Sequence, residues 1–265
     1  MLNGLDLFSG IGGISLALKE WVRPIAYCEN DRYAQAVLLS RMGQGQLPTA
    51  PIWDDIRTLG SRNFMDRGSS AVDIIVGGFP CQDISCAGTR KGLEGDRSRL
   101  FFEFVRLIRD LRPRFVFLEN VPAITVRGLE RILLELTALG YDARWTIVSA
   151  AEFGACHLRQ RWFLLAHTYC EGGRNEQITQ PKRRGEAAAF DSSEDIADTN
   201  GARLEGLWGQ ESELCRPASY NGWASKPTVR RGAHGVSNRV DRIRGLGNAV
   251  VPMQAREAFI RLMGI

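Results

Sequence analysis

Several features are missing from this 265-residue sequence, and each absence excludes a class of function. No apolar run approaches the roughly 18 residues of a membrane-spanning helix, so we expect no membrane partner. No basic stretch precedes the first apolar residues, which argues against a secretory signal and favours the cytoplasm. No G-x-G-x-x-G fingerprint is present, so a dinucleotide-dependent oxidoreductase fits poorly.

Cysteine and histidine are too few and too poorly spaced to predict a metal site. There are six cysteines, three histidines and no C-x-x-C pair. Cys156 and His157 are adjacent, and an apolar segment separates them from His167 and Cys170. We therefore predict no metal, and free thiols in a reducing compartment rather than a disulfide framework.

Lysine is also scarce, since arginine supplies most of the 34 basic residues and the net charge is only +4. The guanidinium fork suits phosphates and guanine edges, although codon bias would produce the same excess. The charge is uneven along the chain. Residues 168–222 are net acidic and residues 223–265 are strongly basic, which mildly favours a nucleic-acid partner.

Apolar runs alternate with amphipathic segments over residues 1–167. Strands are expected at 5–8, 24–28, 72–76, 115–118, 145–148 and 162–166, and helices at 14–21, 33–41, 98–111, 129–139 and 252–263. This alternation predicts an α/β fold with a doubly wound, mostly parallel sheet. Ligands bind such sheets beyond the carboxyl ends of the strands. Residues 168–222 cannot extend the sheet and are expected to form a small irregular module.

A glycine-rich loop, Ser9-Gly10-Ile11-Gly12-Gly13, follows the first strand, and Glu29 closes the second. Glycine lets a ligand approach the backbone closely, and an acid at the second strand end can bind ribose hydroxyls. The pair suggests a cofactor that contains a nucleoside. A purely structural tight turn is the alternative.

The third strand ends in Gly-Gly-Phe-Pro-Cys-Gln at 77–82, which places Cys81 at the mouth of the sheet. A thiolate there is a candidate nucleophile, whereas the alternative is a small buried apolar residue. Glu119 ends the neighbouring strand and is a candidate general acid, or else a capping or surface carboxylate. Arg159 and Arg161 are two residues apart, so both side chains would point to one face of a strand. Two guanidinium groups there would bind an anion or a carbonyl oxygen. The alternative is that they are solvated residues at the start of the strand.

These blocks together resemble the cytosine-C5 DNA methyltransferases, especially the bacterial and phage members. The matching segments cover about 1–167 and 236–258: DLFSGIGG at 6–13, Asp54-Asp55-Ile56, GGFPCQDIS at 77–85, GLEGDRSRLFF at 92–102, ENV at 119–121, RQR at 159–161 and GLGNAVVP at 245–252. The resemblance implies a Rossmann-like methyltransferase domain over 1–167. A short target-recognition region would follow over 168–238, and a C-terminal segment over 239–265 would pack back on the catalytic domain.

The resemblance also implies S-adenosylmethionine as cofactor. Its site would comprise Phe8, Ser9, Gly10, Ile11, Gly12, Gly13, Glu29, Asn30, Asp55, Ile56, Pro80, Leu100, Asn248 and Ala249. Phe8 would stack on the adenine and Glu29 would bind the ribose. Asn30 stands where an aromatic residue often follows that acid, so one wall of the cofactor pocket is expected to be thinner.

For catalysis the resemblance implies Cys81 as the nucleophile at cytosine C6 and Glu119 at the N3 edge. Arg159 and Arg161 would hold the O2 side and the active-site loop. The base that removes the C5 proton is not identified and water can serve. The arginine block reads Cys-His-Leu-Arg at 156–159 where many members have Pro-Gln, which leaves the role of His157 open.

Double-stranded DNA is the expected partner, bound by a monomer with the target base flipped out of the helix. The residues expected to contact DNA are Gln82, Ser85, Arg97, Arg203, Arg216, Arg230, Arg231 and Arg239. The recognition region is short and partly acidic, so we predict a short or degenerate target of about two to four base pairs. Restriction partner, phage self-protection and host regulation stay open as biological roles.

Two alternatives share parts of this interpretation. A tRNA cytosine-C5 methyltransferase would use the same chemistry, but such enzymes tend to have a second proline where this chain has Phe79. A catalytically inactive nucleic-acid or cofactor-binding relative would be expected to lose one of the four candidate catalytic residues, and all four are present.

Overall fold

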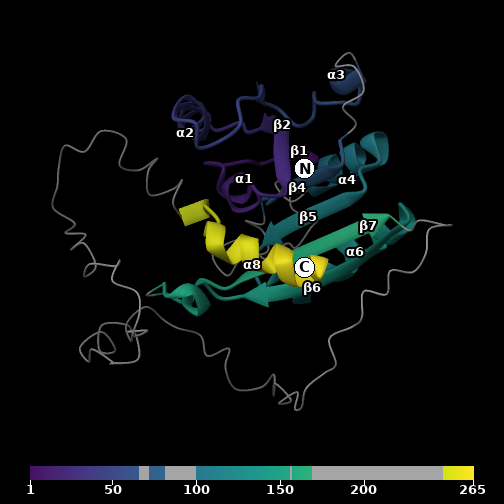
Figure 1. Cartoon of the computed structure of the whole chain (residues 1–265). Helices are drawn as coiled ribbons and strands as arrows, with labels where there is room; N and C mark the ends of the chain where they lie inside the picture. The colour runs from purple at the N-terminus through teal and green to yellow at the C-terminus, as the bar shows by residue number, and fades with distance from the viewer. Residues whose placement is uncertain (66–71, 81–99, 156, 169–246) are drawn as a thin grey trace, which may run out of the picture. The chain divides into compact units, whose positions relative to one another are not determined.

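A computed structural model describes residues 1–65, 72–80, 100–155, 157–168 and 247–265 of the chain (Figure 1). In chain order its elements are β1 (Leu2–Leu7), α1 (Gly13–Ala17), β2 (Val22–Cys28), α2 (Arg32–Gly43), β3 (Ile52–Trp53), α3 (Arg62–Met65), β4 (Ile74–Gly77), α4 (Leu100–Leu111), β5 (Phe115–Asn120), α5 (Ile124–Arg127), α6 (Leu129–Ala138), β6 (Tyr141–Val148), the 3₁₀ turn η2 (Ala150–Phe153), β7 (Arg161–Thr168) and α8 (Pro252–Met263).

The strands form a seven-stranded sheet in the order β3-β2-β1-β4-β5-β7-β6. The first five strands in this order pair in parallel, and β7 is antiparallel to both β5 and β6. The α/β prediction with a mostly parallel sheet is therefore confirmed. The chain order reverses beside β1 and β4, and their carboxyl ends form the crevice where such sheets bind ligands.

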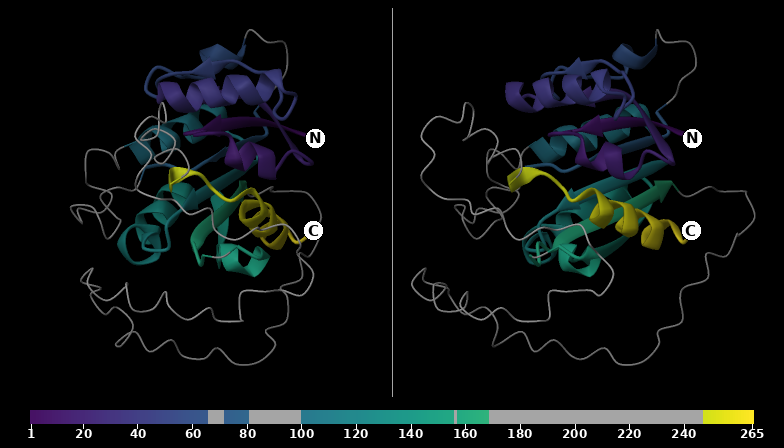
Figure 2. Two further views of the ribbon diagram at one scale, coloured as in Figure 1. Left: turned by 90° about the vertical axis from the view of Figure 1, so that its left-hand side faces the viewer. Right: turned by 60° about the vertical axis from the view of Figure 1, so that its left-hand side comes forward.

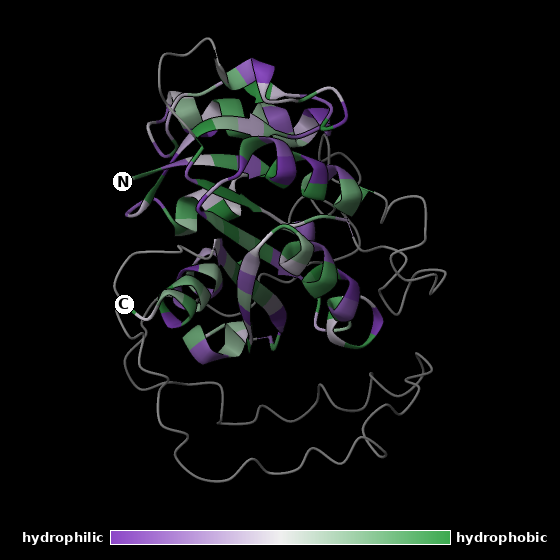
Figure 3. Ribbon diagram, turned by 90° about the vertical axis from the view of Figure 1, so that its right-hand side faces the viewer, coloured by the Kyte–Doolittle hydropathy of each residue, from purple (hydrophilic) through white to green (hydrophobic). Residues whose placement is uncertain are grey.

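Helices cover both faces of the sheet, as the rotated views show (Figure 2). One face packs on α4, α5 and α6 through residues such as Phe104, Ile124 and Leu136. The other face packs on α1 and α8 through residues such as Ile14 and Phe259, while α2 covers its edge in a smaller cluster. Figure 3 shows hydrophobic residues along the central strands, which explains why these strands have near-continuous apolar sequences.

Element boundaries differ from the predictions where the chain turns. The helix expected at 14–21 ends at Ala17, because the chain turns at Leu18–Trp21 to enter β2. The two-residue strand β3 was not predicted from the sequence, since Ile52-Trp53 is too short to give a periodic pattern. Every residue that the structure describes belongs to one compact unit, and the recognition region predicted at 168–238 lies outside the described residues beyond Thr168. In the described segments, no helix is long and apolar enough to cross a bilayer.

Candidate active site

The loop after β1 is held at the carboxyl end of the sheet by Glu29, the residue that follows β2. The Glu29 carboxylate accepts hydrogen bonds from the backbone N–H of Gly10 at 2.7 Å and of Asp31 at 2.8 Å. Gly10 and Gly12 have positive φ angles of 54° and 82°, which glycine adopts without strain. The nearest atom that a Cβ on Gly10 would meet among the described residues is the Phe8 carbonyl oxygen at 4.0 Å, so the loop leaves space beside its backbone.

Phe8 lies at the turn out of β1 with a φ of 53°, an uncommon conformation for a bulky residue. Its ring stacks on Phe104 of α4, with 6.5 Å between the centroids, and stays partly exposed. Strained residues cluster at ligand sites, so this geometry fits the predicted role of Phe8 as a stacking surface.

Beneath the same loop, β1 buries the carboxyl group of Asp6, which is 1% exposed. Burial raises its pKa to about 7, although the Ser15 hydroxyl, which donates a hydrogen bond to it, acts in the opposite direction. The other carboxyl oxygen has no partner among the described residues. Asp6 was not predicted as a site residue, but a charged residue inside an apolar strand was a visible signal.

The segment that leads into α8 lies against the start of α1. A Cβ on Gly13 would lie 2.7 Å from the Cγ1 atom of Val250, so only glycine admits this contact. Asn248 and Ala249 directly precede Val250, so the segment that carries them reaches the glycine-rich loop from more than 230 residues away in the sequence. The structure thus brings the last predicted block to the predicted cofactor loop.

Asp55 and Ile56 follow β3, whose Trp53 carbonyl accepts the Glu29 N–H at 2.8 Å. The Asp55 carboxylate pairs with Arg57 at 2.8 Å, and this partner keeps its pKa below the ordinary value. Ile56 is 4% exposed and packs in the core. The hydrogen bond between Glu29 and Trp53 thus brings the start of this segment to the end of β2, and the adenine contacts of Asp55 and Ile56 stay a prediction.

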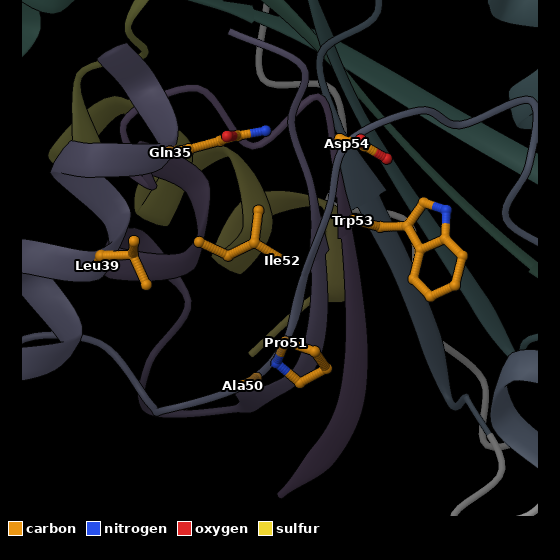
Figure 4. Close-up of a pocket in the computed structure, with 7 residues that line it drawn as sticks. All are labelled: Gln35, Leu39, Ala50, Pro51, Ile52, Trp53 and Asp54. Carbon is orange, nitrogen blue, oxygen red and sulfur yellow. The ribbon is translucent and has the colours of Figure 1, made fainter. Parts of the chain in front are cut away.

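An open pocket of about 570 Å³ runs along the outer edge of β3 (Figure 4). It is lined by Gln35, Leu39, Ala50, Pro51, Ile52, Trp53 and Asp54. Leu39 and Ile52 lie on one side of the strand, and the indole of Trp53 lies on the other. None of the predicted site residues lines this pocket.

The most distinctive arrangement is a buried ion pair at the carboxyl end of β5. The Glu119 carboxylate contacts the Arg161 guanidinium at 2.8 Å, and the two side chains are only 13% and 15% exposed. Burial raises the pKa of Glu119 to about 7, while Arg161 and then Arg159 act to lower it. Glu119 can therefore hold or release a proton near neutral pH, as a general acid requires.

The loop after β4 packs directly on this carboxylate. A Cβ on Gly78 would lie 2.6 Å from the Glu119 Oε2 atom, so a larger residue there would displace the carboxylate. The buried Asn120 side chain donates a hydrogen bond to the Phe79 carbonyl at 3.2 Å, which fixes the chain just before Pro80. The expectation that the strand before Cys81 neighbours the strand of Glu119 is confirmed by the pairing of β4 with β5.

Arg159 and Arg161 do not share one face of a strand, so that prediction was wrong. Strand β7 begins at Arg161, and Arg159 precedes it with a left-handed φ of 35°. The Arg159 guanidinium donates hydrogen bonds to the carbonyls of Gly247 and Ala249 instead. It joins the arginine block to the segment that carries Asn248.

Several predicted residues lie outside the described part of the chain: Cys81, Gln82, Ser85, Arg97, Arg203, Arg216, Arg230, Arg231 and Arg239. Asn30 is described and exposed, and Leu100 is partly buried at the start of α4. Among the described residues, no group of three or more histidine, cysteine or acidic side chains could hold a metal ion. Sequence reasoning assigned no role to Asn120 and Gln254, two buried polar residues.

Comparison with known proteins agrees with this geometry. The sequence model of the C-5 cytosine-specific DNA methylases matches residues 2–246. The type II methyltransferase M.CviJI of Paramecium bursaria Chlorella virus IL3A is 34% identical over 61% of this chain and 42% of its own length. The type II methyltransferase M.HhaI of Haemophilus parahaemolyticus is 31% identical over 68% of this chain and 53% of its own length. The chain thus spans about half the length of the curated relatives it matches.

Among solved structures, a prophage-encoded protein of E. coli described as a DNA modification methyltransferase is 27% identical. It has a TM-score of 0.52 and covers 63% of this chain and 47% of its own. S. pombe Dnmt2, at 22% identity and a TM-score of 0.51, covers 71% of this chain and 57% of its own and shares the fold.

The sheet order and the likeness to the prophage-encoded structure define the Rossmann-like fold class of the S-adenosylmethionine-dependent methyltransferases. Within that class, the chain belongs to the C-5 cytosine-specific DNA methylase family.

Proposed function

We propose that this chain is a DNA cytosine-C5 methyltransferase. The single observation that carries the proposal is the buried Glu119–Arg161 pair, packed against the Gly78 backbone just before Cys81 in the sequence. A proton-holding carboxyl group and a guanidinium beside a cysteine are what a nucleophilic attack on a pyrimidine ring needs.

The described residues fit S-adenosylmethionine as the cofactor. Open space beside Gly10, the carboxylate of Glu29 and the partly exposed ring of Phe8 meet at one end of the sheet. In the proposed site Glu29 binds the ribose, Phe8 stacks on the adenine, and Asn248 closes the side nearest α8. When bound, this cofactor supplies an electrophilic methyl group.

The chain's own residues activate the cytosine. The Cys81 thiolate forms a bond from its Sγ atom to C6, and the electron pair of the C5–C6 double bond makes C5 electron-rich. Glu119 donates its proton to N3, while Arg161 stabilises the charge that develops at O2. Once C5 is methylated, with S-adenosylhomocysteine as the leaving group, water removes the C5 proton and the Sγ–C6 bond breaks, which regenerates the thiolate. N3 returns its proton to the Glu119 carboxylate in the same step.

The proposed substrate is double-stranded DNA, and its target base must leave the helix to reach Glu119. Base flipping costs a few kcal/mol, which contacts to phosphates and neighbouring bases offset. Gln82, Ser85, Arg97 and the arginines between 203 and 239 are the proposed contacts. We propose a monomer in the cytoplasm of a bacterial or phage-infected cell, with a target of about two to four base pairs.

Bisulfite sequencing of DNA from cells that express the wild type or Cys81→Ala tests this proposal. Wild-type DNA should show one short sequence context protected from conversion, and the mutant DNA should show none. Purified wild type should also methylate duplex DNA in preference to tRNA. Methylation by the Cys81→Ala variant, or a preference for tRNA, would contradict the proposal.

A further inference from the structure

Gln254 is a fully buried polar residue on the inner face of α8. Its side-chain N–H₂ group donates to the carbonyls of Val148 at 2.5 Å and of Arg159 at 2.7 Å. Its side-chain oxygen has no partner among the described residues. Burying such an oxygen costs free energy, and an apolar residue of the same shape would avoid this cost. Packing alone therefore does not account for a glutamine here.

The second of these carbonyls belongs to Arg159, the residue with a left-handed φ that lies just before β7. The preceding carbonyl, that of Leu158, accepts hydrogen bonds from the Ala150 N–H at 2.8 Å and the Ser149 hydroxyl at 2.7 Å. The two successive carbonyls are thus held from two directions. Since a left-handed φ is costly for arginine, these hydrogen bonds maintain the turn that places Arg161 on Glu119.

The Arg159 side chain completes a reciprocal connection with the C-terminal segment. It donates at 2.7 Å to the Gly247 carbonyl and also to the Ala249 carbonyl, and these two residues flank Asn248. Helix α8 thus holds the Arg159 backbone, and Arg159 holds the segment that leads into α8. Figure 1 shows α8 lying along β6 and β7, the strands that this connection joins.

We propose that Gln254 is a positioning residue, which fixes Arg159 so that Arg161 stays on Glu119 and Asn248 stays beside the cofactor loop. This inference rests on the proposed function and deepens it by assigning a role to α8. It links the site for the flipped base to the cofactor site through one residue of the turn.

The charges around Glu119 give the connection a measurable signature. In the described part of the chain, Arg161 and Arg159 are the cations that lower the pKa of Glu119, and both belong to the turn that Gln254 holds. If the turn shifts, both cations move away and the carboxyl group keeps its proton to higher pH. A loss of packing alone would not produce this change.

The test compares Gln254→Met with Leu262→Met, a matched control at another buried position on the same face of α8. Gln254→Met keeps the size of the side chain but removes both hydrogen bonds. We expect kcat to fall at least about 10-fold, as for a small misplacement of a catalytic group. The basic limb of its pH profile should move up by about half a unit or more. Leu262→Met should change neither.

Arg159→Lys provides a second, independent arm. Lysine cannot form the two-carbonyl bridge, so this variant should weaken S-adenosylhomocysteine binding, measured by calorimetry, and should shift the pH profile in the same direction. Adding Gln254→Met to Arg159→Lys should then produce little further loss, because both changes break one connection.

The outcomes separate this inference from the proposed function. A wild-type protein that transfers no methyl group to DNA would contradict the proposed function. The inference about Gln254 would then be decided by the affinities of the variants for S-adenosylhomocysteine. An active wild type with an unchanged pH profile in Gln254→Met, or with fully additive effects in the double variant, overturns only the inference. Equal affinities of Gln254→Met and Leu262→Met for S-adenosylhomocysteine would also count against it.

Discussion

Asp6→Asn should remove a large part of the pH dependence of this protein's stability. Asp6 is 1% exposed in β1, and burial raises its pKa from an ordinary value of 3.8 to about 7. The folded chain therefore binds this proton more tightly than the unfolded chain. The free energy of unfolding should fall as the pH rises between these two values, and it should level off above about pH 7.

The size of the effect follows from the shift in pKa. Each unit corresponds to about 1.36 kcal/mol, so the shift destabilises the folded state above pH 7 by at most about 4 kcal/mol. Asparagine can still accept the Ser15 hydrogen bond, but it cannot ionise. The new amide also adds a constant cost of burial, so the slope against pH is the quantity to compare. Glu119 contributes equally to both proteins and cancels in the difference.

Urea unfolding at several pH values from 5 to 8 gives the two stability curves. As the pH rises across this range, the free energy of unfolding of Asp6→Asn should increase relative to that of the wild type by roughly 2 kcal/mol or more. Asp142→Asn, at an exposed position on β6, is the control and should run parallel to the wild type. Parallel curves for Asp6→Asn would refute the reasoning, because they would mean that Asp6 does not hold its proton in the folded state.

Three further predictions concern the proposed site for the flipped cytosine around Glu119. Gly78→Ala puts a carbon 2.6 Å from the Glu119 carboxylate and should lower kcat on the order of 100-fold. Gly60→Ala is the control, because its new carbon would lie 4.0 Å from the nearest atom, and it should leave kcat unchanged. Equal kcat values for the two variants would contradict this prediction. Glu119→Gln should lower kcat about 10²- to 10⁴-fold and abolish the pH dependence near 7, so a retained basic limb would argue against Glu119 as the acid. Arg161→Lys should shift the basic limb to higher pH by weakening the ion pair, and an unchanged limb would rule out Arg161 as the group that lowers the Glu119 pKa.

Much of the fold was predictable from local patterns. The apolar run before Gly77 and the run at Phe115–Leu118 are typical of buried parallel strands, and they pair as parallel neighbours in the sheet. The last helix was predicted with the correct bounds, because Pro252 marks its first turn. Glu119 directly follows the second of these runs. The rule that binding sites lie beyond the carboxyl ends of parallel strands then made it a candidate site residue.

The remaining features depend on contacts between distant segments, which no local pattern reports. The left-handed turn at Arg159 is stabilised by Gln254, 95 residues further along the chain. The raised pKa of Asp6 depends on complete burial beneath α1, and a sequence pattern does not give the depth of burial. For the same reason, the spacing of Arg159 and Arg161 suggested one shared face, whereas the structure gives them different partners.

The central claim is that the Cys81 sulfur bonds transiently to cytosine C6, and a mechanism-based trap tests it most directly. Duplex DNA with 5-fluorocytosine at the target position blocks the final elimination, because fluorine replaces the proton that must leave. Incubation with the protein and S-adenosylmethionine should give a stable covalent complex, and peptide mass spectrometry should locate the adduct on Cys81. An enzyme that methylates ordinary DNA but forms no such adduct, or forms it at another residue, would contradict the account.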